Sequence, residues 1–114
     1  MSAKSLGQKQ REFLPMVARL IEFAYANGYE LTVGDGYRDP RLHGALGVKI
    51  GYGAANSCHK IRLAIDLNLF RDGKYLTATK DYRVLGEFWE SIGGAWGGRF
   101  SDGNHFSIEH EGRK

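Results

Sequence analysis

Four residues of the sequence are of the types, and at the spacings, that a catalytic metal site needs. His59 stands seven positions before Asp66, and Asp102 stands three positions before His105. Two imidazoles and one carboxylate form a ligand set that zinc uses in hydrolytic sites, where a fourth position stays open to water. A further carboxylate next to such a site can accept the proton of the attacking water. The sequence therefore contains the groups for metal-assisted hydrolysis.

The spacing between His59 and Asp66 restricts how the chain could bring them to one ion. A helix would separate them by about 10 Å at a rise of 1.5 Å per residue. A flat strand would place residues at an odd spacing on opposite faces. We therefore expect a bend, with His59 on a loop, Asp66 on the following strand and His105 on a later strand. Spacing alone leaves a simpler alternative open, in which Asp102 only forms a turn and the histidines lie in the core.

The first element that must position these residues is an N-terminal helix. Ser5 and Gln8 fit a capping box, and Gly28 is a natural end point. Pro15 either kinks this helix or opens its main part after a short leader turn. The apolar positions that define the buried face are Phe13, Val17, Leu20, Ile21 and Ala24.

The remaining elements are short. We expect strands over residues 29–33, 63–70, 95–96 and 105–108, and a hairpin at Asp72-Gly73 that leads into residues 74–76. A second helix, capped by Thr79 or Asp81, ends at Gly93-Gly94. Its expected buried stripe consists of Val84, Leu85, Phe88, Trp89 and Ile92.

Residues 36–57 show no sustained period and read as a long loop with one short helical turn. Loops of that length in a small domain are more often functional than not. The order of the elements predicts an α+β fold, with two main helices packed on a small antiparallel sheet. The segment 93–100 is either a cleft wall or a tight turn whose Trp96 and Phe100 fill the core, and we favour the second interpretation.

Composition limits the class of protein. The 114 residues and 12.7 kDa suit a single domain over residues 1–114, expected to be a monomer. One cysteine excludes an intramolecular disulfide and an all-cysteine zinc site. A net charge of +3, from cations interleaved with acids, favours an anionic partner but argues against nucleic-acid binding. We expect no membrane insertion and no secretory signal, because the sequence lacks the necessary apolar runs.

Two segments carry a resemblance to a known family. Residues 57–66 read SCHKIRLAID, and residues 102–106 read DGNHF. They resemble the zinc peptidases that cleave D-Ala-D-Ala or L-Ala-D-Glu bonds in peptidoglycan, which include VanY-type carboxypeptidases and, as the most similar group, small bacteriophage endolysins. The family motif is Ser-x-His-x-x-Gly-x-Ala-x-Asp, followed some tens of residues later by Asp or Glu-x-x-His. The segment GDGYR at residues 34–38 is also similar to the family, and the resemblance extends to Ile108.

The resemblance implies roles for individual residues. It implies three zinc ligands: His59, Asp66 and His105. It implies that Asp102 is the general base and that Arg38, assisted by Ser57, holds a substrate carboxylate or carbonyl. Alternatives from the residues themselves are a surface ion pair for Arg38 and a loop hydrogen bond for Ser57. Arg62 departs from the family, which often has Gly there, a choice that a positive φ would explain.

The resemblance also implies a hedgehog/DD-peptidase-like fold, with the long loop lining a zinc cleft. The leading hypothesis is a zinc-dependent peptidase that hydrolyses a peptidoglycan stem peptide. Without a secretory signal, an endolysin would stay in the host cytoplasm until lysis or travel with the virion. The alternative is a non-catalytic, zinc-stabilised module that binds the cell wall or belongs to the virion. Asp102 argues against that alternative, because a structural zinc site needs no base.

Overall fold

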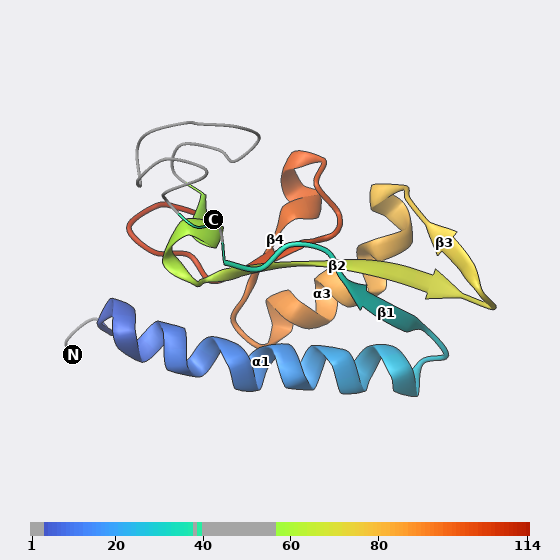
Figure 1. Ribbon diagram of the computed structural model, residues 1–114, viewed down its shortest axis with the longest axis horizontal. Coiled ribbons are helices and arrows are strands. Elements are labelled where there is room, and N and C mark those ends of the chain that lie inside the picture. The colour runs from blue at the N-terminus through green and yellow to red at the C-terminus, as the bar shows by residue number, and fades with distance from the viewer. Residues whose placement is uncertain (1–3, 38, 40–56) are drawn as a thin grey trace.

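The computed structural model describes residues 4–37, 39 and 57–114, and it has the α+β architecture expected from the sequence (Figure 1). Within these described ranges, two helices accompany an open antiparallel sheet of five strands. The helices and strands are α1 (Leu6–Ala26), β1 (Glu30–Val33), β2 (Ala64–Arg71), β3 (Lys74–Leu76), α3 (Arg83–Ser91), β4 (Ala95–Trp96) and β5 (His105–Ser107). Three short 3-10 helices complete the order: η1 (Cys58–Ile61), η2 (Thr79–Tyr82) and η3 (Gly97–Phe100). Most of the loop predicted over residues 36–57 lies outside the described residues.

Strand β2 is the centre of the sheet. The strand order is β1-β2-β5-β4, and β3 also pairs with β2. The first half of β2 pairs with β5, while its second half pairs with β1 and with β3. Any side chain near the start of β2 therefore has β5 as its neighbour.

The two faces of β2 have different environments. Leu67 and Leu69 are 1% and 0% exposed and join a core that includes Phe13 and Leu20 of α1 and Trp89 of α3. Since side chains alternate along a strand, Asp66 and Asn68 project from the opposite face. Figure 1 shows α1 running along one side of the sheet. The polar side chains of β2 thus lie on the side that α1 leaves uncovered.

Helix α1 begins as predicted and differs at Pro15. The Ser5 hydroxyl accepts the Gln8 N–H at 3.2 Å, and the Gln8 side chain accepts the Ser5 N–H at 2.8 Å, which completes the capping box. The helix continues through Pro15, so a separate leader turn is wrong. It ends before Gly28, whose φ of +84° favours glycine. Neither helix in the described part of the chain is long and apolar enough to cross a membrane.

The second half of the chain confirms the hairpin and corrects the start of α3. Asp72 and Gly73 both have positive φ and connect β2 to β3. Neither predicted N-cap residue occupies that position: η2 precedes α3, and the Asp81 carboxylate reaches back to accept the Ala78 N–H at 3.2 Å. Val84 is 45% exposed, so its predicted place in the buried stripe was wrong.

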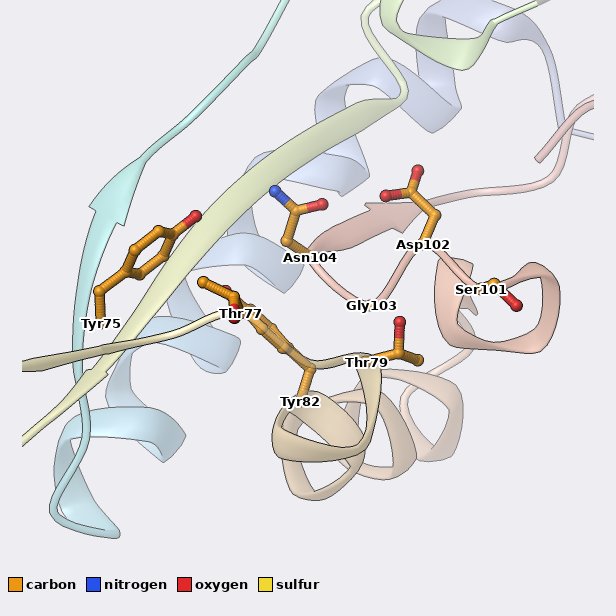
Figure 2. A pocket seen from close by; sticks show the side chains of 8 residues that line it. All are labelled: Tyr75, Thr77, Thr79, Tyr82, Ser101, Asp102, Gly103 and Asn104. Carbon is orange, nitrogen blue, oxygen red and sulfur yellow. The ribbon is translucent and has the colours of Figure 1, made fainter.

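The turn that carries Asp102 is anchored on several sides. The Trp96 indole donates to the Gly103 carbonyl at 2.8 Å, and the Asp102 N–H donates to the Gly97 carbonyl at 2.9 Å. Gly103 also passes close to η2, because a Cβ added to it would lie 2.7 Å from the Thr79 Cα (Figure 2). The close approach to backbone requires glycine at position 103.

Replacing Gly103 by alanine should therefore lower the free energy of unfolding by about 1–3 kcal/mol, the usual cost of forcing an extra methyl group into a packed site. Urea unfolding monitored by tryptophan fluorescence measures the effect. The matched control is Gly36→Ala, since a Cβ at Gly36 meets nothing within 4 Å. Equal stability of the two variants would show that the turn can move away from Thr79.

Candidate metal centre

Three elements of the fold bring His59, Asp66 and His105 to one place. Asp66 on β2 is the direct cross-strand partner of His105 on β5, so both side chains stand on the same face of the sheet. His59 lies on η1, a 3-10 helix, where a loop was expected. The Ser57 hydroxyl caps that helix by accepting the His59 N–H at 3.2 Å. The bend predicted between His59 and Asp66 is confirmed.

Arg62 makes this bend. It ends η1 in the left-handed conformation, with φ 59° and ψ 32°, and the chain enters β2 two residues later. A left-handed residue is where glycine is favoured, which explains the glycine of the family motif. The Arg62 guanidinium lies over the Tyr37 ring, 3.9 Å from its centroid, a contact that offsets part of the backbone cost.

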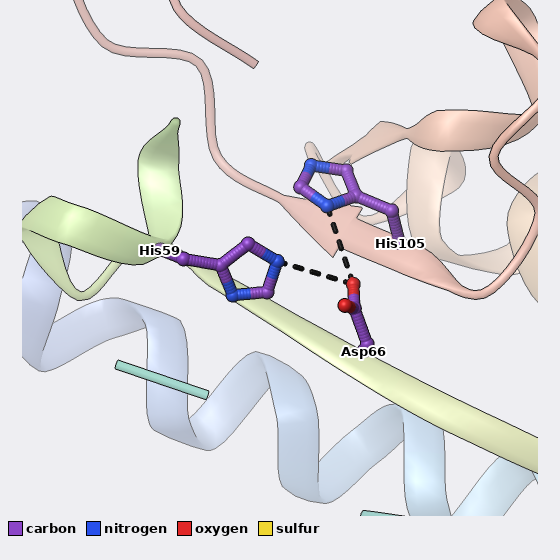
Figure 3. A group of neighbouring side chains, drawn as sticks. All are labelled: His59, Asp66 and His105. Carbon is purple, nitrogen blue, oxygen red and sulfur yellow. Dashed lines mark hydrogen bonds and ion pairs between the residues drawn. The ribbon is translucent and has the colours of Figure 1, made fainter. Parts of the chain in front are cut away.

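The three side chains converge at the distances of a first coordination shell (Figure 3). Asp66 Oδ1 lies 3.1 Å from His59 Nε2 and 3.4 Å from His105 Nδ1. One ligand atom from each of the three residues lies within 4.8 Å of the others. Ligands of a tetrahedral zinc ion at about 2.0–2.1 Å from the metal are about 3.3 Å apart. The two separations from Asp66 match this value, and the group could therefore hold a metal ion.

The hydrogen bond of His59 shows which of its ring nitrogens is free to bind a cation. Its Nδ1 lies 2.7 Å from the Gly36 carbonyl, which can only accept, so Nδ1 carries a hydrogen. In the neutral ring, Nε2 then presents a lone pair to the carboxylate of Asp66. Two acceptors at 3.1 Å need a positive charge between them, either a proton or a metal ion. In metal sites, the ring nitrogen of a histidine that does not bind the metal often donates to a backbone carbonyl in this way.

Asp102 borders this group without belonging to it. Its Oδ2 lies 4.0 Å from His105 Nδ1, and its side chain is 51% exposed. His59 and His105, by contrast, are 1% and 5% exposed, and only the Asp66 side chain, at 16%, is partly open among the three. A half-exposed carboxylate at the edge of the group can exchange protons with solvent and reach a molecule bound in front of it.

Comparison with known protein families shows to which of them this chain belongs. Residues 51–108 match the family described as D-alanyl-D-alanine carboxypeptidase. The chain belongs to this family. The match includes the three converging residues and Asp102, while Arg38 lies before it. None of the curated proteins matches the chain. Members of this family are metal-dependent. The geometry of the His-Asp-His group and the family of the peptidase therefore both indicate a metal centre.

The electrostatics of the peptidase keep Asp66 ionised. Burial alone would raise the pKa of Asp66, but hydrogen bonds from His105 and His59 outweigh it and lower the pKa from 3.8 to about 2. A carboxylate that stays charged between two imidazoles is a ready cation ligand.

Two predicted substrate residues of the peptidase remain predictions. Ser57 is 7% exposed and caps η1, so its clearest contact is with the backbone of His59. Its predicted contact with substrate is not tested by this arrangement. Arg38 lies outside the described residues, and so does the part of the long loop that was expected to line the cleft.

Sequence reasoning missed the neighbours of the metal group. Trp96 is 5% exposed and lies in the core, as the preferred interpretation of segment 93–100 predicted. Phe100 is 50% exposed, so its predicted core position was wrong. Its ring lies 5.7 Å from that of His105 and flanks the imidazole of the peptidase. Asn68, two residues after Asp66, was also overlooked. Its alternation with buried Leu67 and Leu69 places it on the face of Asp66, a signal that was available in the sequence.

Proposed function

We propose that this protein is a zinc-dependent peptidoglycan peptidase of the endolysin type, which hydrolyses a stem-peptide bond, either L-Ala-D-Glu or one that contains D-Ala. The observation that carries the proposal is the convergence of His59, Asp66 and His105, with the exposed carboxylate of Asp102 4.0 Å from His105. The family match supports a peptidase that acts on peptidoglycan peptides.

Each residue of the site has a distinct role in the proposed reaction. Zn²⁺ held by His59, Asp66 and His105 would supply a Lewis acid that polarises the peptide carbonyl and acidifies water. Asp102 accepts the proton of the attacking water and passes it to the leaving amine. The Gly36 carbonyl keeps the His59 ring in the tautomer that leaves Nε2 free. The balance is simple: one water is consumed, the C–N bond breaks, and a carboxylate and an amine form.

A purely structural zinc site is less consistent with this geometry. Structural sites surround the ion with four protein ligands. Within the described ranges, the cluster contains three candidate ligands. The carboxylate of Asp102 lies next to it with half its surface in solvent, where a stabilising site has no use for it.

Digestion of purified muropeptides, analysed by mass spectrometry, tests the proposal. We expect zinc-loaded protein to release products that end at L-Ala or lack a D-Ala residue, and the masses identify the bond. Treatment with a chelator should stop the release, and added Zn²⁺ should restore it. Intact muropeptides after prolonged incubation with loaded protein would overturn the proposed activity in favour of a binding module.

For Arg38 we propose the recognition of a substrate carboxylate, as the resemblance implies. Arg38→Ala should then reduce kcat/KM by about 10- to 100-fold, the equivalent of one charge-assisted hydrogen bond of about 1.5–3 kcal/mol. Thermal unfolding and zinc content should stay unchanged. Arg83→Ala is the control, because Arg83 is exposed and pairs with Glu87 one turn further along α3. Loss of folding in Arg38→Ala alone would favour a structural ion pair instead.

A further inference from the structure

Asp102, which borders the metal centre, also lines a small polar pocket (Figure 2). It has a volume of about 190 Å³ and lies between the segment that follows β3 and the turn that precedes β5. Its wall consists mainly of hydroxyl and amide groups, from Tyr75, Thr77, Thr79, Ser101 and Asn104, together with the carboxylate of Asp102. The mechanism above uses only the last of these residues.

The lining determines which chemical groups fit. Among the described residues that form the wall, Asp102 is the only charged one, and none of them is a lysine, arginine or histidine. A ligand carboxylate in this pocket would therefore meet the Asp102 carboxylate, and no side-chain cation from the described wall would offset their repulsion, which is unfavourable. Hydroxyls and an amide both donate and accept hydrogen bonds. The pocket matches an uncharged group that also does both, such as a carboxamide.

The amide of Asn104 is oriented by its neighbours. Its Nδ2 donates to Asn68 Oδ1 at a distance of 3.5 Å. The same Asn68 oxygen accepts a hydrogen bond from the Tyr75 hydroxyl, also at 3.5 Å. Bonds of this length are weak, so a ligand can replace them at small cost. In this orientation, Asn104 turns its second polar atom, Oδ1, away from Asn68. The Tyr82 hydroxyl is not available in this way, since it already bonds Leu69 N–H and the Leu76 carbonyl.

The position of Asp102 relates the pocket to one side of the scissile bond. In the proposed function, on which this inference rests, Asp102 delivers a proton to the leaving amine. Substituents of the residue that carries this amine must then lie near Asp102, on the pocket side. In a bond between L-Ala and D-Glu, the nearest such substituent is the α-carboxyl group of D-Glu, which is either free or amidated.

We infer that the pocket binds an uncharged carboxamide on the leaving-group residue, and that the enzyme therefore selects amidated over free-acid stem peptides. Hydrogen bonds from the threonine hydroxyls and Asn104 hold the carboxamide. The carboxylate of Asp102 repels the free acid. Selectivity of this kind depends on charge, and so it should respond to a change of charge in the wall.

Two synthetic stem peptides that differ only in this group, carboxamide or carboxylate, test the inference. We expect zinc-loaded wild type to cleave the amidated peptide with a kcat/KM about tenfold higher or more, the size expected for a partly exposed pair of like charges. Thr77→Lys places a cation at the exposed edge of the pocket and should bring the ratio to one or below. Ala26→Lys adds the same charge at the end of α1, on the other side of the sheet, and should leave the ratio unchanged.

A binding readout separates this inference from the proposed activity. The amidated peptide added to metal-free protein should shift the backbone amide resonances of Thr77 and Thr79, and the free-acid peptide should shift them less. Cleavage of both peptides at equal rates, or a preference for the free acid in wild type, would overturn the inference and leave the peptidase function intact. Cleavage of neither peptide would overturn the proposed function, and the inference with it.

Discussion

Replacing Asp102 by asparagine should abolish peptide cleavage while the protein keeps its metal. Asparagine has nearly the same shape as aspartate, but it cannot accept a proton at neutral pH, so the attacking water loses its base. The loss should be about 10²- to 10⁴-fold in kcat, the usual contribution of a general base. Mass spectrometry of digested muropeptides gives the rate, and metal analysis of the purified variant should give the same zinc content as wild type.

The design of this experiment depends on the location of Asp102. Its side chain is 51% exposed and its Oδ2 lies 4.0 Å from Nδ1 of His105, so the substitution changes neither the core nor the ligand set. Asp72→Asn is a matched control: Asp72 is exposed in the β2–β3 turn with a φ of 52°, which asparagine tolerates well. Unchanged turnover in Asp102→Asn would dismiss Asp102 as the base, and loss of zinc would identify it as a ligand.

The metal group could be predicted because few residues qualified. The chain has four histidines, and two of them, His59 and His105, stand near an aspartate within the segments that resemble a known family. The strand register then follows from local patterns, since the Asp72-Gly73 turn fixes where β2 ends. Asp66 is placed opposite His105 by the pairing of β2 with β5, and that pairing is a property of the whole sheet.

The surroundings of the group could not be predicted in the same way. The left-handed Arg62 has a residue type that gives no sign of its conformation, and only the family's glycine pointed to it. Phe100 is apolar and was assigned to the core, yet it flanks His105 because η3 turns it outward. The polar pocket combines Tyr75 and Thr77 with Asn104, from segments that a single sequence does not relate.

Asp66→Asn should remove zinc binding, and with it both activity and the stabilisation that zinc provides. The substitution keeps the size of the side chain but replaces an anionic ligand, which the two histidines hold in the charged form, by a neutral amide. Zinc at about 100 times its Kd should stabilise wild type by about 2.7 kcal/mol, because it binds the folded chain. A chelator should reverse this gain. Thermal unfolding with and without zinc should therefore show an upward shift of Tm in wild type and none in Asp66→Asn.

The comparison with Asp102→Asn makes this prediction specific to the ligand set. Both substitutions remove one negative charge from the same cleft, but only Asp66 lies within the His-Asp-His group. Asp102→Asn should keep the zinc-dependent rise in Tm, although it loses activity. If Asp66→Asn retained the rise, the metal would bind elsewhere. If wild type showed no rise and no bound zinc, the two histidines and Asp66 would be an ion-paired cluster, since a proton can occupy the position between Nε2 of His59 and Oδ1 of Asp66 that the ion would take.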